Sequence, residues 1–303
     1  ATRCQNAGAN IISMSLGGSR SNRTEQTKFD QLLAANILPI AAAGNDGNNR
    51  TSFPAGYASV MSVAAVDVNN AKASFSQFNS DVEISGPGVG VLSTVPNGQG
   101  LLGSLNVGGL VVEAFPFEGS PRLSRSGALF DLGIGNAVNA GASGKVCLIA
   151  RGTVDFVTKI NNCQASGGVG AVIYNNAPGA FSGTLGTTVT SIPSVSISQA
   201  DGTALLARVG QATTVAVGAA NYAYLDGTSM ATPHVSAVAA LVWSYFTPAN
   251  PTAGRTCTAT QLRNSLNRSA RDLGAAGRDT SFGFGLVQAR AAYDRIVSLG
   301  CGN

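Results

Sequence analysis

The sequence is poor in histidine, in charge and in aromatic residues. Its 303 positions hold one histidine, 11% charged residues and 6% aromatic residues. A Cys/His metal site needs several such ligands at close spacing, and the five cysteines form no Cys-x-x-Cys pair. Neither a zinc site nor a Cys-x-x-Cys redox site is therefore expected.

Long apolar runs and clusters of basic residues are also missing. The longest candidate for a membrane span, Val235 to Trp243, falls short of the ~18 apolar residues that a span needs. The net charge of +4 is spread thinly, without the Lys/Arg runs that bind nucleic acid or an anionic membrane surface. We therefore expect no nucleic-acid partner and no membrane partner.

Glycine and apolar residues are abundant. The sequence holds 38 glycines and is 44% hydrophobic, which indicates a folded globular protein rather than a disordered chain. Its length fits one large domain or two smaller ones. Cysteines without metal-site spacing indicate disulfides or buried thiols, and they favour an oxidising, extracytoplasmic compartment. Secretion is therefore expected.

The N-terminal residues lead abruptly into the first element. Residues 4–9 have the pattern of a helix end that runs straight into a buried strand at Ile11, and no signal peptide precedes them. We therefore expect further sequence of the same protein upstream of Ala1.

Strand and helix patterns alternate over the first ninety-odd residues. The segment Thr24 to Asn36 places Phe29, Leu32 and Leu33 on one helical face, with Thr24 as the expected N-cap. Such helices between apolar strands predict a parallel sheet covered on both faces, with function at the carboxyl ends of the strands. The expected strands are Ile11–Leu16, Ile37–Ala43 and Val60–Val68.

The pattern changes near Gly98 and again at Ser229. Residues 101–217 consist of short strand patterns broken by glycine, serine, asparagine and proline, which predicts a small separate domain. After Ser229, an apolar run at 235–246 predicts a central helix that is buried on nearly every side. The other expected helices are Val154–Ala165, Thr260–Leu273 and Val287–Val297.

One segment, Gly227 to Val242 (GTSMATPHVSAVAALV), carries the clearest chemistry. A serine at the start of a helix lies beside free backbone N–H groups that favour an anion. Pro233 is expected to be tolerated because the N–H groups of the first turn have no helical partner. By itself, this pattern fits either a nucleophile or the cap of a buried helix.

This segment resembles the nucleophile motif of the subtilisin-like (S8) serine peptidases. Two further segments agree in the family's order. Asn10–Gly18 (NIISMSLGG) resembles the substrate-binding strand, and Ala41–Gly47 (AAAGNDG) resembles the oxyanion-hole segment. Ser85–Gly88 and Gly283–Val287 are similar to further landmarks of the family. The resemblance implies an α/β fold, a parallel-sheet subtilisin-like catalytic domain that is incomplete at its N-terminus.

The resemblance also sets the expected domains. The peptidase domain would cover residues 1–100 and 218–303. The segment between them, 101–217, resembles a protease-associated (PA) domain, chiefly in Gly144–Gly152 (GKVCLIARG) and Tyr174–Asn176. Subtilases commonly carry such an insertion, which is β-rich, non-catalytic and thought to cover or feed the substrate cleft. An inert stabilising insertion is the open alternative.

Catalytic roles follow from the resemblance residue by residue. Ser229 would be the nucleophile. Asn45 would donate its side-chain N–H to the tetrahedral oxyanion, with the Ser229 backbone N–H as the second donor. Without the resemblance, Asn45 between two glycines indicates only a turn.

Substrate-binding roles follow in the same way. An edge would pair with an extended substrate, and small residues would line the pocket for the side chain before the scissile bond. Asp46, at the pocket rim, would favour a basic or polar side chain, unless it is a solvated turn carboxylate. The edge comprises Ser15, Leu16 and Gly17; the pocket comprises Ala42, Ala43 and Gly44; Thr228 belongs to the same binding region.

The sequence departs from the family pattern in the residues that would supply the catalytic general base. Its one histidine, His234, lies five positions after the serine, and five helical residues turn by ~500°, so the imidazole is expected to point away. No Asp or His-Gly motif precedes Ile11. We expect a secreted serine endopeptidase that forms an acyl-enzyme on Ser229, with His and Asp supplied by a missing upstream segment. The alternative is a catalytically incomplete peptide-binding protein.

The expected partners are therefore a protein or peptide substrate and the missing N-terminal segment. No cofactor is expected for the chemistry. Structural calcium is implied by the family alone, because no carboxylate cluster marks a site, and the metal content stays unknown.

The five cysteines could form two bonds in fifteen ways, and spacing does not choose among them. The expected domain boundaries do select one pairing. Cys147 and Cys163 both lie in the PA-like segment, whereas Cys257 and Cys301 bracket the two C-terminal helices. Cys4 is left over, and we expect its partner in the missing N-terminal segment.

Overall fold

The computed structural model describes residues 1–303, and its most apolar segments form a parallel four-stranded sheet, β1-β2-β3-β4. Every residue of β2 and β3 is buried, as expected for central strands that are covered on both faces. The strands are β1 (Ile11–Met14), β2 (Leu38–Ala42), β3 (Met61–Val66) and β4 (Ile84–Pro87).

Helix α2 (Arg23–Ala34) covers one face of this sheet. Phe29 and Leu32 pack with Ile12 and Ala41, residues that point to that side of β1 and β2. The expected N-cap is wrong: Asn22 caps the helix, because its side-chain oxygen accepts from the N–H groups of Thr24 (2.8 Å) and Glu25 (3.1 Å). A short helix, α1 (Thr2–Asn6), precedes β1.

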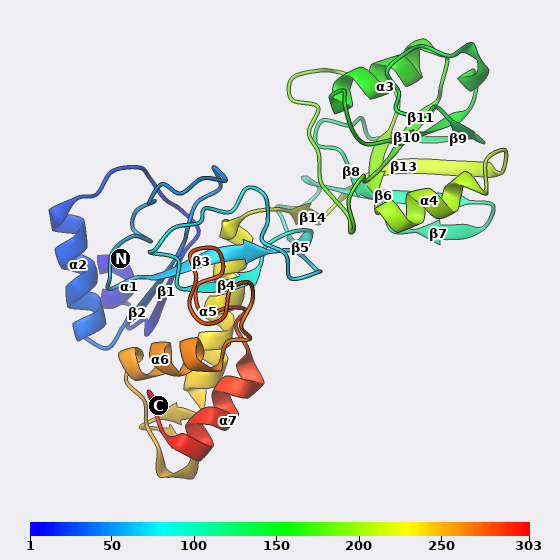
Figure 1. Ribbon diagram of the computed structural model, residues 1–303. Coiled ribbons are helices and arrows are strands. Elements are labelled where there is room, and N and C mark those ends of the chain that lie inside the picture. Colours follow the sequence, from blue (N-terminus) through cyan, green and yellow to red (C-terminus); the bar gives the residue numbers. More distant parts are fainter. The chain divides into compact units, whose positions relative to one another are not determined.

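The helices of the C-terminal part pack on the other face. Helix α5 (Thr228–Ser244) lies along the sheet, with α6 (Ala259–Ser269) and α7 (Ala289–Leu299) beside its C-terminal half (Figure 1). The expectation that α5 is buried on nearly every side is wrong. It buries one face against the sheet, α6 and α7, whereas Leu241 on the other side is 54% exposed. The small elements β15 (Phe246–Thr247), β16 (Asn250–Pro251) and η2 (Thr252–Gly254) join α5 to α6.

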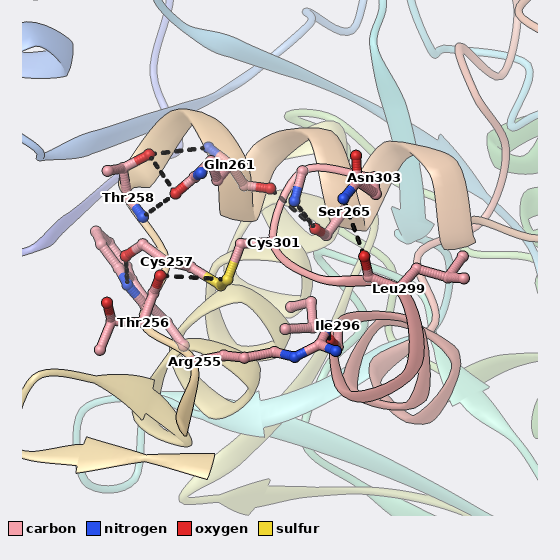
Figure 2. Close-up of a disulfide and its surroundings, with 12 residues drawn as sticks. Arg255, Thr256, Cys257, Thr258, Gln261, Ser265, Ile296, Leu299, Cys301 and Asn303 are labelled. Atoms are coloured by element: carbon pink, nitrogen blue, oxygen red, sulfur yellow. Dashed lines mark hydrogen bonds between the residues drawn. A yellow bond between two sulfur atoms is a disulfide. The ribbon is translucent and has the colours of Figure 1, made fainter. Parts of the chain in front are cut away.

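A disulfide between Cys257 and Cys301 closes this C-terminal part (Figure 2). It joins the residues just before α6 and just after α7. Thr258 begins α6 with a capping box shared with Gln261, and the N–H of Gly302 donates to Ser265 Oγ (2.9 Å). The end of the chain is therefore tied to α6 by a covalent bond and by hydrogen bonds.

The chain forms two compact units, residues 1–89 with 226–303, and residues 90–225. The sequence predicted domain boundaries at 100/101 and 217/218, whereas the two units divide at 89/90 and 225/226. β5 (Val91–Thr94) and β14 (Tyr222–Leu225) pair with each other and so belong to the second unit. Within the first unit, the Gly227 N–H donates to the Gly88 carbonyl (2.8 Å), so the chain leaves and re-enters that unit at adjoining residues.

The second unit is built around one eight-stranded sheet of order β7-β6-β13-β9-β10-β11-β12-β8. Strands β9 to β12 run parallel, and the remaining pairs are antiparallel. A disulfide joins Cys147 on β10 to Cys163 on α3. The elements are β6 (Gly100–Val107), β7 (Leu110–Val112), β8 (Phe115–Pro116), β9 (Ser124–Asp131), η1 (Ala140–Ala142), β10 (Val146–Ala150), α3 (Phe156–Ala165), β11 (Gly170–Tyr174), β12 (Ser194–Ile197), α4 (Gln199–Leu206) and β13 (Ala212–Ala220).

Candidate active site

Ser229 is the second residue of α5. The N-terminal end of this helix lies near the carboxyl ends of the sheet strands, where Gly44 follows β2 and Gly88 follows β4. Its side chain is half-buried, and its hydroxyl lies 3.5 Å from the Ser15 carbonyl oxygen. No hydrogen bond within the protein engages the Ser229 N–H, one of the free donors that every helix start presents. The helix thus offers a hydroxyl and a free N–H donor at one residue.

Asn45 reaches this helix start from the loop that follows β2. Its Oδ1 accepts from both the Thr228 N–H (2.9 Å) and the Thr228 hydroxyl (2.7 Å). A backbone N–H can only donate, so the amide oxygen must face Thr228 and Nδ2 must face away from it. Thr228, which is fully buried, also accepts from the Gly44 N–H (3.2 Å). Two donors, Asn45 Nδ2 and the Ser229 N–H, are therefore left free at this end of α5.

Pro233 is accommodated differently from the sequence-based expectation. It is the sixth residue of α5, past the first turn, and an ordinary residue there would donate its N–H to the Ser229 carbonyl. The Ser15 hydroxyl donates to that carbonyl instead, at 2.6 Å. A side chain from the segment after β1 thus replaces the helical hydrogen bond that proline removes, and it holds Ser15 against Ser229.

A cleft of about 290 Å³ opens beside these residues. The backbones of Leu16 and Gly17 line it and take part in no hydrogen bond within the protein, so this edge is free to pair with an extended chain. A Cβ at Gly17 would lie 2.4 Å from Ser52 Oγ, so a larger residue there would displace the Ser52 hydroxyl. The lining residues are Leu16–Ser19, Ala42, Gly44–Asp46, Arg50–Ser52, Gln77, Thr228 and Ser229.

Two residues predicted to bind substrate, Ala43 and Ser15, do not line the cleft. Ala43 is 2% exposed and packs in the core with Ala64 and Val82, because successive side chains of an extended chain point to opposite sides. Ala42 and Gly44 line the cleft, whereas Ala43 does not. Ser15 is not part of the cleft wall and contacts Ser229 instead.

Arg50 and Gln77 line the cleft and were not predicted from the sequence. Arg50 adds a positive charge to the wall that carries Asp46, and both residues are exposed. Neither residue stands in a motif. Arg50 follows the turn-forming run Gly44–Asn49, and Gln77 lies 31 residues after Asp46. Only the folded chain brings them to the cleft.

His234 does not face the serine hydroxyl. Its ring Nδ1 lies 2.8 Å from the Met230 carbonyl oxygen, one turn back on the same helix, and the side chain is exposed. The Ser229 hydroxyl has no histidine or carboxylate partner within residues 1–303. The site therefore presents a serine hydroxyl beside two free N–H donors, with no histidine or carboxylate facing that hydroxyl.

No group of three or more His, Cys, Asp or Glu side chains is arranged to hold a metal ion.

Comparisons with known proteins agree with this geometry. The model of the subtilase family matches residues 1–105, and the model of the PA domain matches residues 113–205. Alkaline elastase YaB of Bacillus sp. (strain YaB) is 46% identical over 91 residues, which are 30% of this chain and 24% of that protein. Subtilisin DY of Bacillus licheniformis is 42% identical over 94 residues, which are 30% of this chain and 34% of that protein. The matched segments thus span between a quarter and about a third of these relatives.

A solved structure extends the likeness to the whole chain. The psychrophilic subtilisin-like protease Apa1 from the Antarctic psychrotroph Pseudoalteromonas sp. AS-11 has a TM-score of 0.82 and 38% identity, covering 100% of this chain and 73% of that chain. The chain belongs to the subtilase family. A lanthipeptide protease, with a TM-score of 0.53 and 18% identity, shares the fold.

This subtilase carries an inserted PA domain, because the PA match lies wholly within the second unit. The family and the fold class expected from the sequence are thereby confirmed. Within the PA domain, the Arg151 guanidinium lies over the rings of Phe156 (5.6 Å) and Phe181 (4.6 Å), and its Nη1 donates to Asn175 Oδ1 (3.0 Å). Burial lowers the pKa of Arg151. The Arg-Gly motif of the sequence thus anchors an aromatic cluster.

No helix of this subtilase is long and apolar enough to cross a membrane.

Proposed function

We propose that this subtilase is a secreted serine endopeptidase that hydrolyses peptide bonds through an acyl-enzyme on Ser229. The observation that carries the proposal is the joint placement of a helix-start serine and two free N–H donors, from Asn45 and from Ser229 itself. An extended peptide would pair with the free edge at Leu16 and Gly17. Its side chain before the scissile bond would enter the cleft.

The chemistry needs no cofactor. The Ser229 oxygen attacks the peptide carbonyl carbon while a general base takes the hydroxyl proton, and the carbonyl oxygen becomes an anion that the two N–H donors bind. Collapse of this intermediate breaks the C–N bond, and the amine leaves with the proton. Water then repeats the sequence on the acyl-enzyme and releases the acid.

Residues 1–303 do not supply the general base that this reaction needs. His234 bonds its own helix, and no other histidine exists in the chain. We propose that a histidine and the aspartate that orients it come from a segment of the same protein outside residues 1–303. The two disulfides support secretion, because such bonds persist in oxidising compartments.

Labelling with a radioactive sulfonyl fluoride tests this proposal. We expect stoichiometric labelling of Ser229 in the protein expressed from its complete gene, none in its Ser229→Ala variant, and none in the 303-residue chain alone. Labelling of the 303-residue chain would show that a base acts within it and would contradict the division of roles.

A second function is favoured by the same missing base. If the complete gene encodes no histidine that reaches Ser229, the cleft and its free edge would serve a non-catalytic peptide-binding protein. Calorimetry with an extended peptide would then show binding to the complete protein, which would neither label nor hydrolyse.

A further inference from the structure

Gln77 lies in the segment between β3 and β4 and is 1% exposed. A buried amide must satisfy its donors and acceptor within the protein. Every side-chain hydrogen bond of Gln77 goes to the loop Gly44–Arg50, which we call the oxyanion loop because it carries Asn45. The side chain therefore serves one loop alone.

Hydrogen bonds from the backbone and the side chain of Gln77 hold the two peptide groups on either side of Asn45. The Gly44 carbonyl, which begins the peptide group before Asn45, accepts from the Gln77 backbone N–H (3.0 Å). The Asp46 N–H, which ends the peptide group after Asn45, donates to Gln77 Oε1 (3.0 Å). With both flanking peptide groups fixed, the backbone of Asn45 has little freedom to rotate.

The rest of the loop wraps around the same amide. The Asn48 N–H donates to Gln77 Oε1 (3.2 Å), while Gln77 Nε2 donates to Asn48 Oδ1 (3.1 Å) and to the Arg50 carbonyl (3.1 Å). At Gly44, where φ is +112°, a Cβ would lie 2.6 Å from Gln77 Cγ. Glycine is required there because the side chain of Gln77 lies so close to the loop.

We propose that Gln77 is a positioning residue for the oxyanion hole. It acts through Asn45, fixing the backbone that carries the amide while Thr228 fixes the amide itself. Because the oxyanion forms only in the transition state, loosening this loop lowers kcat and leaves substrate binding at the Leu16–Gly17 edge largely intact. The inference rests on the proposed function.

A double-mutant cycle in the protein expressed from its complete gene tests it. Gln77→Met keeps the volume and the backbone bond to Gly44 but removes the five side-chain bonds. We expect kcat to fall by about 10- to 100-fold, the size that misplacing a reacting group costs, with KM little changed. In an Asn45→Ala background the same substitution should change kcat little, because the group that it positions is already gone.

Ser76→Ala is the matched control. Ser76 adjoins Gln77 and is fully buried. Its hydroxyl accepts from the Ala65 N–H on β3 (3.0 Å) and donates to the Gln77 backbone carbonyl (3.3 Å), but it makes no hydrogen bond to the Gln77 side chain or to the oxyanion loop. Its loss should lower Tm and leave kcat unchanged. If Gln77→Met does not fold, Gln77→Glu keeps Oε1 and the length but loses the donors, and it should show the same dependence on Asn45.

The outcomes separate this inference from the proposed function. An active Ser229→Ala variant would overturn the proposed function. If Ser229→Ala is inactive and Asn45→Ala lowers kcat, an unchanged kcat in Gln77→Met, or an equal loss in both backgrounds, overturns the role of Gln77 alone.

Discussion

Single hydrogen bonds set the chemistry of this site at the residue scale. The amide of Asn45 is useful to an oxyanion only if Nδ2 faces the cleft, and the donor-only N–H of Thr228 enforces that orientation. Removing one such donor from subtilisin costs about 10²–10³ in kcat. We therefore expect side chains that orient these donors to affect kcat without touching the substrate.

Ser15 and Pro233 form a compensating pair, and a substitution can expose it. In Ser15→Ala the Ser229 carbonyl loses its hydroxyl donor, and Pro233 offers no N–H in its place. We expect the free energy of unfolding to fall by about 1 kcal/mol and kcat to fall with it. Chemical denaturation and steady-state kinetics measure the two effects.

Pro233→Ala provides the control for this pair. Alanine at 233 restores the helical N–H, so adding Ser15→Ala to Pro233→Ala should cost less than it does in the parent. Equal costs in the two backgrounds would show that the Ser15 hydroxyl does not act through the Ser229 carbonyl.

The charges of the cleft make a separate prediction about specificity. Asp46→Ser should lower kcat/KM for Lys or Arg before the scissile bond relative to Phe or Leu, and Arg50→Ser should lower it for Glu. Both side chains are exposed, so we expect changes of no more than about fivefold. A peptide series that differs at this one position measures the ratios, and unchanged ratios would place both charges in solvent.

At the scale of elements, α6 is fixed to the sheet by a largely buried ion pair. Arg263 pairs with Glu83, which precedes β4, and its Nη1 donates to the Ala58 carbonyl (2.9 Å). Asn267, one turn further along α6, also donates to Glu83 (2.6 Å). The helix is thus joined to the strand that leads out of the first unit.

Breaking this pair should destabilise the protein strongly. Arg263→Met leaves the Glu83 carboxylate buried without its countercharge, and we expect a loss of about 3 kcal/mol in the free energy of unfolding. Urea denaturation measures it, with Arg268→Met, an exposed arginine on the same helix, as the control. The double variant Arg263→Met/Glu83→Leu should recover part of the loss, and a further loss would contradict the argument.

The elements themselves could be predicted from the sequence because apolar periodicity encodes them. The observed α6 and α7 begin within two residues of the expected starts, at Ala259 and Ala289. The role of Gln77 could not be predicted, because it depends on contacts with a loop about 30 residues away that no periodicity records. The inward turn of Ala43 was missed for a related reason: a run of three alanines gives no sign of which one faces the cleft.

At the scale of the whole molecule, each covalent cross-link stays within one unit. Cys147–Cys163 joins a strand and a helix of the PA domain, and Cys257–Cys301 closes the C-terminal part of the first unit. The insertion between Val89 and Asp226 therefore brings its own stabilising bond. A cross-link within a unit stabilises that unit without constraining the other.

The state of the five cysteines tests this organisation. Both expected disulfides are present in the structure, and Cys4 is an exposed free thiol on α1. Ellman's reagent should therefore titrate one thiol in the native 303-residue chain and five after reduction in denaturant. Non-reducing peptide mapping should recover Cys147 with Cys163 and Cys257 with Cys301. A peptide that joins Cys4 to any of these four would contradict this pairing of the cysteines.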